Sequence, residues 1–467
     1  MELNDTQVQA IVAQVVQKIA AKKNGITPAP QKNESTTTSW GVYHEVSDAI
    51  EAAAEAFETY RKMDMGQRAR FIEGIREMGL SNKESLARMV FNETQMGRYE
   101  DKILKHEVAA LETPGIEDLK TQTWSGNNGL AVEEYAPFGV IGTITPSTHP
   151  SETIINNTIM MLAAGNTVVI GAHPTAKKVS AHVVQLINKA LEQAGAPHNL
   201  VTTVDEPTFE SAGEMFKHPK VALLSITGGP GVVRAALKSN KKVIAAGPGN
   251  PPVVIDASAD LKRAAYYITK SASFDNNILC TSEKEIYVVD KVYNAFMQAM
   301  KKAGNYILTS SQMDRLASSV FEKKKYLHIV KREFVGRNAS VLAKQIGINL
   351  SDDLPLLLGE TNKDHLFVIE EQLMPCIPVV RVNSYEEGIK LAIEAEHGYR
   401  HTASTFTQDM NKATEFARQA NCSIFVINGG TYQGDGGAEG EGTLSYTIAT
   451  PTGECVTRPK NFARIRR

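Results

Sequence analysis

The chain has 467 residues, 42% of them hydrophobic and 22% charged, which is enough to bury one or two large cores in about three domains of roughly 150 residues each. Its 50 basic and 52 acidic side chains nearly balance, which excludes a broad electrostatic surface for nucleic acid or an anionic membrane. Its four cysteines have neither CxxC nor metal-ligand spacing, no secretory signal precedes them, and no apolar run approaches the roughly 20 residues of a membrane span, so we expect a cytoplasmic protein without a bound metal.

Residues 1–23 have the spacing of an amphipathic helix, with hydrophobic side chains at i, i+3, i+4 and i+7. Residues 24–40, rich in Ser, Thr and Pro, indicate a flexible linker. A helix with an apolar stripe needs a partner, and the pattern alone leaves open whether that partner is its own domain or another protein. Its polar face is not basic enough for a helix that lies on a membrane surface.

Beyond the linker the sequence predicts an α/β fold. Helical spacing runs through residues 43–113, and a hairpin is expected near 124–137. Strands and helices then alternate, with strands expected at 140–145, 167–170, 201–204, 221–226, 243–245 and 253–256 and helices at 151–164, 175–194 and 231–239. A second alternating unit spans about 260–435. Apolar strands that alternate with helices are typical of a parallel sheet covered on both faces.

Two strand-to-helix turns are candidates for binding a phosphate-bearing ligand, because helix N-termini at the carboxyl edge of a sheet offer free amides. The first is Thr227-Gly228-Gly229-Pro230-Gly231, whose glycines allow close approach of the backbone. The second runs from Gly171 to Lys178 and contains His173 and Pro174 ahead of two lysines. Neither is a GxGxxG motif, and a tight connection or a solvated basic helix start explains each pattern as well.

Cys280 is a candidate nucleophile. It follows the polar run Asp275-Asn276-Asn277 and precedes the strand-like residues 285–289, a place where a fold can offer a thiolate to a pocket. A free cysteine is more often a small buried hydrophobe, which is the simpler interpretation of the other three cysteines.

Eight motifs in order resemble the aldehyde dehydrogenase superfamily from about residue 42 to the C-terminus. They are residues 145–150 (TPSTHP), 161–166 (MLAAGN), 173–180 (HPTAKKVS), 226–231 (ITGGPG), 249–252 (GNPP), 273–277 (SFDNN) with Cys280, 371–375 (EQLMP) and 450–454 (TPTGE). Within the superfamily the sequence is most similar to the CoA-acylating branch, and there to the enzymes that oxidise propanal in bacterial microcompartments. The resemblance implies a Rossmann-like parallel-sheet cofactor domain, an α/β catalytic domain and a β-hairpin oligomerisation arm.

The resemblance also implies a role for each candidate residue. Cys280 matches the nucleophile whose thiolate adds to a short-chain aldehyde, and the resulting alkoxide would be held by the Cys280 amide and the Thr148 hydroxyl, where hydrolytic relatives have asparagine. The implied cofactor is NAD, which this branch generally uses, although the ribose positions do not distinguish it from NADP. Its contacts would be Thr227, Gly228 and Gly229 at the pyrophosphate, Glu371 at the nicotinamide ribose, and His173 with Pro174 beside the adenine ribose.

One absence favours coenzyme A over water as the acyl acceptor. Hydrolytic family members have a water-activating glutamate in the motif aligned with residues 245–251, and here that position falls on Ala245. A general base contributes about 10² to 10⁴-fold, so without one the Cys280 thioester is expected to react with the better nucleophile, the CoA thiol. The alternatives are a hydrolytic aldehyde dehydrogenase that releases the free acid and, from another class, a catalytically silent microcompartment scaffold.

Three features depart from the family pattern or stay open. His149 stands where the nearest relatives usually have asparagine, and from the sequence we favour a packing role over a contact with the acyl pocket. Residues 434–442 are more acidic than the family's glycine-rich run, which leaves their part in the active-site wall open. For His401 we favour a structural role, although its surroundings resemble a run near the active-site cleft.

The resemblance divides the chain into an encapsulation helix and three further parts. The helix is residues 1–23, followed by the linker 24–40. The further parts are a NAD-binding domain at 41–247 with the hairpin at 124–137, a catalytic domain at 248–440, and a C-terminal strand with a basic tail at 441–467. The helix would dock on shell proteins and place the enzyme in the lumen of a microcompartment in the bacterial cytoplasm. The hairpin and a strand near 444–450 would join subunits into a homodimer or homotetramer.

Overall fold

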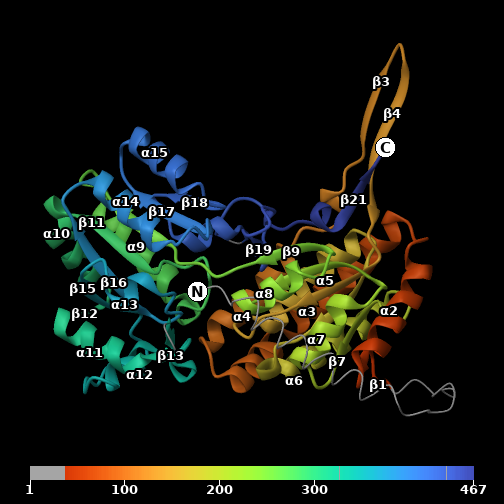
Figure 1. The fold of residues 1–467 in the computed structure, drawn as a ribbon, viewed down its shortest axis with the longest axis horizontal. Helices are drawn as coiled ribbons and strands as arrows, with labels where there is room; N and C mark the ends of the chain where they lie inside the picture. Colours follow the sequence, from red (N-terminus) through yellow and green to blue (C-terminus); the bar gives the residue numbers. More distant parts are fainter. Residues whose placement is uncertain (1–36, 325–326, 438) are drawn as a thin grey trace, which may run out of the picture. The chain divides into compact units, whose positions relative to one another are not determined.

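Two seven-stranded sheets, each covered by helices on both faces, carry the fold (Figure 1). The computed structural model describes residues 37–324, 327–437 and 439–467, so the helix predicted at 1–23 and most of the linker predicted at 24–40 lie outside the described residues. The end of the linker prediction is wrong, because Thr37–Ser39 form strand β1 and pair with β2 (Val42–Tyr43). No helix in the described part of the chain is long and apolar enough to cross a membrane.

The first sheet has the strand order β1-β2-β7-β6-β5-β8-β9, and every pair beyond β1 and β2 is parallel. Its other strands are β5 (Val140–Ile144), β6 (Thr167–Gly171), β7 (Val201–Val204), β8 (Val221–Thr227) and β9 (Lys242–Ala246). The strands expected from the sequence are confirmed here. Their Val- and Ile-rich runs are buried on both faces, as the centre of a parallel sheet requires.

Seven helices surround this sheet. They are α2 (Val46–Tyr60), α3 (Met65–Thr94), α4 (Tyr99–Leu111), α5 (Pro150–Ala163), α6 (Lys177–Gln193), α7 (Phe209–Lys217) and α8 (Pro230–Leu237). Successive strand residues point to opposite faces, so Val168 packs into a core with α3, α5 and α6, whereas Val169 packs into a second core with α2, α7 and α8. The alternation of strands and helices therefore produces a sheet that is covered on both sides.

The second sheet has the strand order β12-β15-β16-β11-β10-β17-β18 and is parallel throughout. Its strands are β10 (Pro252–Ile255), β11 (Glu285–Val289), β12 (Tyr306–Leu308), β15 (Leu357–Thr361), β16 (Cys376–Val382), β17 (Thr402–Phe406) and β18 (Ile424–Ile427). The helices are α9 (Leu261–Ser273), α10 (Asp290–Lys302), α11 (Ser310–Val320), α12 (Ala339–Lys344), α13 (Leu366–Ile369), α14 (Tyr385–Ala395) and α15 (Met410–Ala420). A separate antiparallel pair is formed by β13 (Phe321–Lys324) and β14 (Leu327–Val330).

A three-stranded arm projects from the first half of the fold (Figure 1). The predicted hairpin forms its outer part as β3 (Gln122–Gly126) and β4 (Gly129–Pro137), and β21 (Ala463–Arg466) pairs with β4. The strand expected near 444–450 is reduced to β19 (Ile448–Ala449), which pairs with β20 (Cys455–Val456). The segment expected to be a basic tail thus supplies the strand that joins the hairpin.

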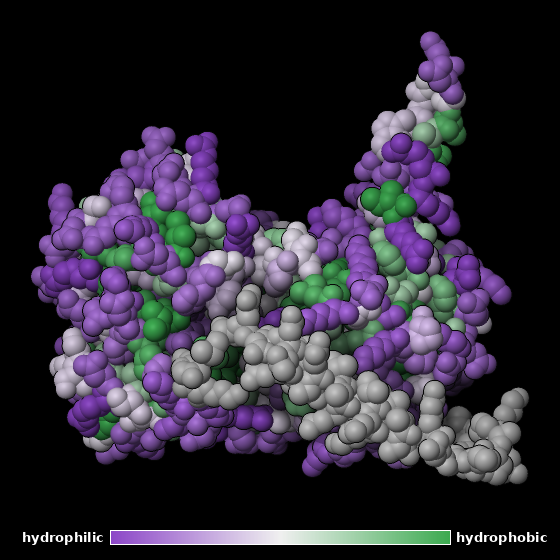
Figure 2. All heavy atoms as spheres, in the orientation of Figure 1, coloured by the Kyte–Doolittle hydropathy of each residue, from purple (hydrophilic) through white to green (hydrophobic). Residues whose placement is uncertain are grey.

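Hydrophobic side chains stay exposed on the arm. Trp124, Leu130 and Ile465 are 47%, 67% and 64% exposed, and Figure 2 shows hydrophobic side chains grouped among the hydrophilic ones along this projection. An antiparallel arm with so few strands needs a further surface to cover such side chains.

Candidate active site

Cys280 lies in a short loop between α9 and β11, and the backbone before it is left-handed at three consecutive residues. In the 3-10 turn η3 (Phe274–Asn277), the φ angles of Asp275, Asn276 and Asn277 are 47°, 55° and 64°. Asp and Asn adopt this region more readily than other residues with a Cβ atom. The polar run before the cysteine therefore makes the sharp turn that presents Cys280 ahead of β11.

Asp275 anchors this turn to α4. Its Oδ2 atom lies 3.0 Å from Lys102 Nζ and 2.8 Å from Lys105 Nζ, and its Oδ1 atom accepts the Arg98 N–H at 2.8 Å. The carboxylate and both ammonium groups are almost completely buried. Burial alone would raise the pKa of Asp275, but the two lysines hold it below its usual value. The carboxylate is thus ionised and fixed by two cations from the first half of the chain.

Lys284 closes the loop from the other side. Its buried Nζ atom donates to Asn277 Oδ1 at 2.6 Å and to the carbonyl oxygens of Asn277 and Leu279, both at 2.9 Å. Burial lowers the pKa of Lys284 to about 8, while Glu371 opposes that fall. A single ammonium group therefore holds the backbone on both sides of Ile278, two residues before the nucleophile candidate.

Four neighbouring strands begin at the edge where Cys280 lies. Cys280 precedes β11, Glu371 precedes β16, Gly249 precedes β10 and His401 precedes β17, and these strands are adjacent and parallel. A Cβ atom on Gly249 would lie 2.5 Å from the Cys280 carbonyl oxygen and 3.0 Å from His401 Cγ. The amino edge of the second sheet thus brings together a thiol, a carboxyl group and an imidazole.

His401, for which the sequence favoured a structural role, is buried next to this edge. It is fully buried, its Nδ1 atom lies 2.9 Å from Thr402 Oγ1, and its Nε2 atom has no partner among the residues the structure describes. Burial, with help from Lys284, lowers the pKa of His401 to about 3. The imidazole is therefore neutral, and its Nε2 atom is free to form a hydrogen bond.

The predicted cofactor residues lie at the carboxyl edge of the first sheet. Thr227 ends β8, Gly228 and Gly229 lead into α8, and His173 with Pro174 follows β6. The turn that contains Thr148 follows β5, the strand that lies between β6 and β8 in the sheet. The next strand along the chain, β6, lies on one side of β5, and the later strand β8 lies on its other side. Ligands bind at such a switch point in open parallel sheets.

The side chains at this edge make few contacts. Thr227 Oγ1 lies 2.9 Å from Thr447 Oγ1, and His173 Nδ1 accepts the Thr175 hydroxyl at 2.9 Å. The Thr148 hydroxyl is partly exposed and makes no hydrogen bond to a described residue. A Cβ atom on Gly229 would meet no atom within 4 Å. The backbone here is open, as a turn that receives a pyrophosphate must be.

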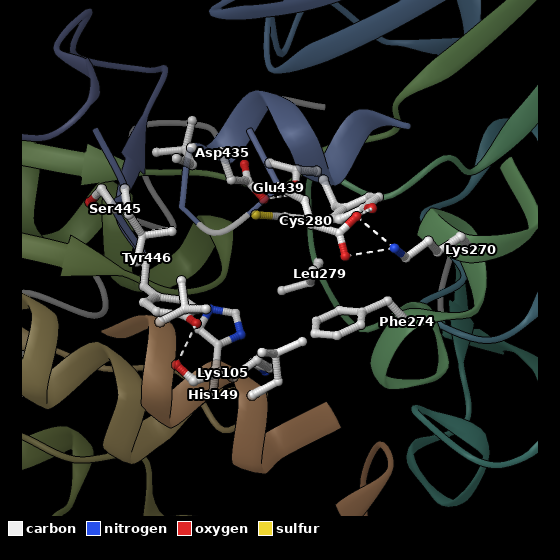
Figure 3. Close-up of a pocket in the computed structure, with 17 residues that line it drawn as sticks. Lys105, His149, Lys270, Phe274, Leu279, Cys280, Asp435, Glu439, Ser445 and Tyr446 are labelled. Atoms are coloured by element: carbon white, nitrogen blue, oxygen red, sulfur yellow. Dashed lines mark hydrogen bonds and ion pairs between the residues drawn. The ribbon is translucent and has the colours of Figure 1, made fainter. Parts of the chain in front are cut away.

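A cavity of about 150 Å³ opens beside Cys280 (Figure 3). Its wall contains Cys280, the rings of Phe274 and Tyr446, and aliphatic groups such as Leu279 and Leu444. None of the predicted cofactor residues lines it, and neither does Thr148. Cys280 thus belongs to the small cavity, and the open turns of the first sheet form a second compartment outside it.

The cavity wall also contains residues that sequence reasoning did not place. His149 is 5% exposed and its ring packs 5.5 Å from that of Tyr446, so the expected packing role is present together with the pocket contact. Asp435 and Glu439, from the acidic segment whose role was left open, line the cavity as well. The acidic side chains within a glycine-rich run were the available signal for both residues.

The cavity side of Cys280 is unfavourable for a thiolate. Burial raises the pKa of the Cys280 thiol to about 12, with Glu371 and Asp435 adding to the rise and Lys284 opposing it. Burial also raises the pKa values of Glu371 and Asp435 to about 7. The free protein thus holds a neutral thiol beside carboxyl groups that are poised to exchange protons near neutral pH.

Ala245 occupies the position in residues 245–251 at which the resemblance would place a water-activating glutamate. It is a fully buried residue of β9 whose N–H donates to Thr452 Oγ1 at 3.0 Å. The other cysteines offer no competing nucleophile, since Cys376 is buried in β16 and Cys422 donates to the Ile424 carbonyl at 3.1 Å.

Comparisons with known proteins agree on one family. The family model described as the aldehyde dehydrogenase family matches residues 17–440. The chain is 43% identical to the acetylating acetaldehyde dehydrogenase EutE of Salmonella typhimurium over 468 residues, covering 100% of this chain and 98% of the relative. It is 46% identical to the structure of propionaldehyde dehydrogenase from Rhodopseudomonas palustris with bound CoA and an acylated cysteine, with a TM-score of 0.89 over 92% of this chain and 98% of that one.

A third similar protein adds a cellular setting. The propionaldehyde dehydrogenase from the fucose-utilisation bacterial microcompartment of Clostridium phytofermentans is 42% identical, with a TM-score of 0.89 over 92% of this chain and 98% of that chain. The fold expected from the sequence motifs is thus the fold of solved relatives that are 46% and 42% identical over most of their length.

Proposed function

The chain belongs to the aldehyde dehydrogenase family, and from that premise we propose that it oxidises propanal or a similar short aldehyde with NAD and coenzyme A to acyl-CoA and NADH. The observation that carries the proposal is the position of Cys280, which follows a left-handed turn and lines a small cavity, in a fold whose first sheet has an open edge for a cofactor. The acylated cysteine and bound CoA of the Rhodopseudomonas palustris structure support the same assignment.

In the first half-reaction the Cys280 sulfur forms a bond to the aldehyde carbon. The thiol proton must leave as that bond forms, because burial keeps the pKa of Cys280 at about 12. Glu371, which shares the strand edge with Cys280 and whose pKa burial raises to about 7, is the group suited to receive it. The alkoxide that results is stabilised by the Cys280 amide, which points toward its own sulfur, and by the unpaired Thr148 hydroxyl.

The open edge of the first sheet fits NAD. Gly228 and Gly229 leave the start of α8 uncovered, and the eight-residue helix presents its positive end to a pyrophosphate beside Thr227. Glu371 holds the nicotinamide ribose, with His173 and Pro174 at the other end of the site. Bound NAD supplies the oxidant that takes a hydride from the aldehyde-derived carbon. Cys280 is then left carrying the acyl group as a thioester.

In the second half-reaction the Cys280 thioester transfers its acyl group to the CoA thiol, and the departing Cys280 sulfur recovers a proton. The wall at Ala245 offers no base to water, so the thioester persists until a thiol arrives. The proton that the incoming CoA thiol loses balances the proton that the departing Cys280 sulfur recovers. The product is an acyl-CoA, and Cys280 is regenerated.

The enzyme acts as an assembly inside a microcompartment. The apolar stripe of residues 1–23 supports docking on shell proteins, and the exposed hydrophobic side chains of the β3–β4 arm support pairing with a second copy of the chain. Removal of residues 1–23 should leave activity unchanged and abolish copurification with shells. Unchanged encapsulation would contradict the docking role of the helix. Removal of residues 124–135 should give monomers by light scattering, and an unchanged mass would contradict the role of the arm.

Intact-mass spectrometry of the enzyme tests the proposed function. With propanal and NAD but no CoA, a single propanoyl group should accumulate on Cys280, and addition of CoA should remove it as propanoyl-CoA. The Cys422→Ser variant should behave in the same way, because that thiol lies outside both compartments. An enzyme that stays unmodified while aldehyde is consumed would contradict the covalent mechanism.

A further inference from the structure

The cavity beside Cys280 holds two polar side chains that the reaction with propanal leaves without hydrogen-bonding partners. His149 and Asp435 both line it, and His149 Nδ1 and Asp435 Oδ1 are buried atoms with no partner in the described parts of the chain. Buried polar groups nearly always have a hydrogen-bond partner, so two groups without one in the same cavity need an explanation. Figure 3 shows both side chains among the residues that surround the cavity.

His149 is fixed in place without using its ring nitrogens. It precedes α5, where its carbonyl oxygen accepts the Thr153 hydroxyl at 2.7 Å, and its ring rests against Tyr446. The imidazole makes no hydrogen bond to a described residue. Burial and the charge of Lys105 keep it neutral by lowering its pKa to about 3. A neutral imidazole carries one N–H donor and one acceptor, so it can pair with a hydroxyl group in either sense.

Asp435 is tied directly to the nucleophile loop. Its Oδ2 atom accepts the hydroxyl of Thr281, the residue after Cys280, at 2.7 Å, and its second oxygen is left over. The carboxyl group therefore sits at a fixed place relative to the thioester sulfur. Its position is held by η5 (Thr431–Asp435), and by the ion pair of Glu439 with Lys270 at 2.6 Å, which joins the same segment to α9.

The remaining wall of the cavity fits a short carbon chain, but such a chain makes no hydrogen bonds to His149 and Asp435. Phe274, Leu279 and Leu444 supply apolar surface, and the Tyr446 hydroxyl already donates to the Lys105 carbonyl. A cavity of about 150 Å³ accepts a molecule of about the size of benzene, which a three-carbon aldehyde does not exceed. An unsubstituted aldehyde would leave both polar groups desolvated and unpaired, whereas a hydroxyl group on its chain offers them a hydrogen-bond donor and acceptor.

We propose that Asp435 and His149 make this cavity selective for a short aldehyde that carries a hydroxyl group, such as 2-hydroxypropanal or 3-hydroxypropanal, over the unsubstituted aldehyde. The inference rests on the proposed CoA-acylating function and specifies its substrate class. A cationic aldehyde fits less well, because the Lys105 side chain lines the same cavity. His149 and the acidic segment are also two places where the sequence departs from the pattern of the family, and the structure brings both departures to one wall.

The test measures kcat/KM with NAD and CoA for propanal, the two hydroxypropanals and 3-aminopropanal. The parent enzyme should prefer at least one hydroxypropanal to propanal by roughly tenfold or more, because a site built to pair a hydroxyl group discriminates against its absence. Asp435→Leu should bring that ratio close to one, and His149→Asn should lower it. Glu441→Gln, on the same segment but exposed and outside the cavity wall, should leave the ratio unchanged.

The ratio of kcat/KM for a hydroxypropanal to that for propanal distinguishes a loss of selectivity from a general displacement of the loop that carries Cys280. An equal loss on all aldehydes in Asp435→Leu, with the ratio intact, would assign Asp435 a positioning role and overturn the inference. A parent preference for propanal, or for 3-aminopropanal above both hydroxypropanals, would overturn it as well. If the parent formed acyl-CoA from none of these aldehydes, the proposed function itself would fail, which is a different outcome from a wrong substrate class.

Discussion

The two sheets meet the active site in opposite ways. The first presents the carboxyl ends of β5, β6 and β8, where the backbone turns are open and Gly229 has free space around it. The second presents the amino ends of β10, β11, β16 and β17, where Gly249 is in tight contact and the groups are buried. Under the proposed function, binding and chemistry would be divided between the two edges: main-chain amides would receive the cofactor, and fixed side chains would perform the reaction.

Replacing the nucleophile should have the largest effect and separate the two edges. Cys280→Ala should reduce acyl-CoA formation by about 10⁴-fold or more, because no other described thiol reaches the cavity. Thr227→Val, on the carboxyl edge, should mainly raise the KM for NAD. Steady-state kinetics for both variants measure the split, and a large fall in kcat for Thr227→Val with little effect of Cys280→Ala would reverse the assignment of roles.

The charges beneath the amino edge should matter more for stability than any surface pair. Asp275→Asn leaves Lys102 buried without its ion-pair partner and Lys105 with only Glu152, 3.8 Å away, so we expect the free energy of unfolding to fall by about 3–5 kcal/mol. Asp290→Asn removes an exposed partner of Arg381, 2.8 Å away, and should have a much smaller effect because solvent screens this pair. Urea titrations of both variants measure the difference. Equal losses would mean that the network under Cys280 does not hold the loop.

The third largest effect should come from adding a methyl group to a glycine at each edge, because the space around the two glycines differs. Gly249→Ala places a methyl group against the Cys280 carbonyl oxygen, so we expect kcat to fall by about 10²-fold as the nucleophile is displaced. Gly229→Ala meets no protein atom and should leave the fold unchanged while raising the KM for NAD. The measurement is kcat and KM together with melting temperature. A Gly249→Ala enzyme with unaltered kcat would show that the amino edge is not rigid.

The smallest effect should come from removing the charge of Glu371, which raises the pKa of the Cys280 thiol. Because the pKa of Cys280 is about 12, iodoacetamide should alkylate it slowly at pH 8, and the rate should rise tenfold for each pH unit through the range 8–10. Glu371→Gln removes a negative charge that raises this pKa, so alkylation at pH 8.5 should become several-fold faster. Near pH 6 the parent and the variant should converge, since Glu371 itself is then protonated. A variant that is slower at pH 8.5 would contradict the sign of this interaction.

The carboxyl edge could be predicted from the sequence because its signals are local. Val- and Ile-rich runs predicted the strands of the first sheet within a residue or two, and the Thr227-Gly228-Gly229 turn needs only its neighbours to form. The nucleophile was equally visible, since the Asp275-Asn276-Asn277 run and its surroundings resemble a known pattern. What these segments have in common is that sequence neighbours determine their conformation.

The amino edge and the cavity wall could not be predicted in the same way. Lys102 and Lys105 look like solvated residues of an amphipathic helix, and only the fold buries them against Asp275. His149 and Asp435 are far apart in the sequence and meet only because α5 and the segment after β18 reach the same cavity. The pairing of β21 with the hairpin is likewise a long-range contact that the basic composition of residues 458–467 conceals.

The most direct test of the central claim is the CoA dependence of NADH formation with a short aldehyde. We predict that without CoA the enzyme produces a single burst of NADH, about equal to the number of Cys280 sites, and that sustained turnover begins only when CoA is added. Sustained NADH production without CoA, accompanied by release of the free acid, would contradict the claim that the Cys280 thioester waits for a thiol rather than for water.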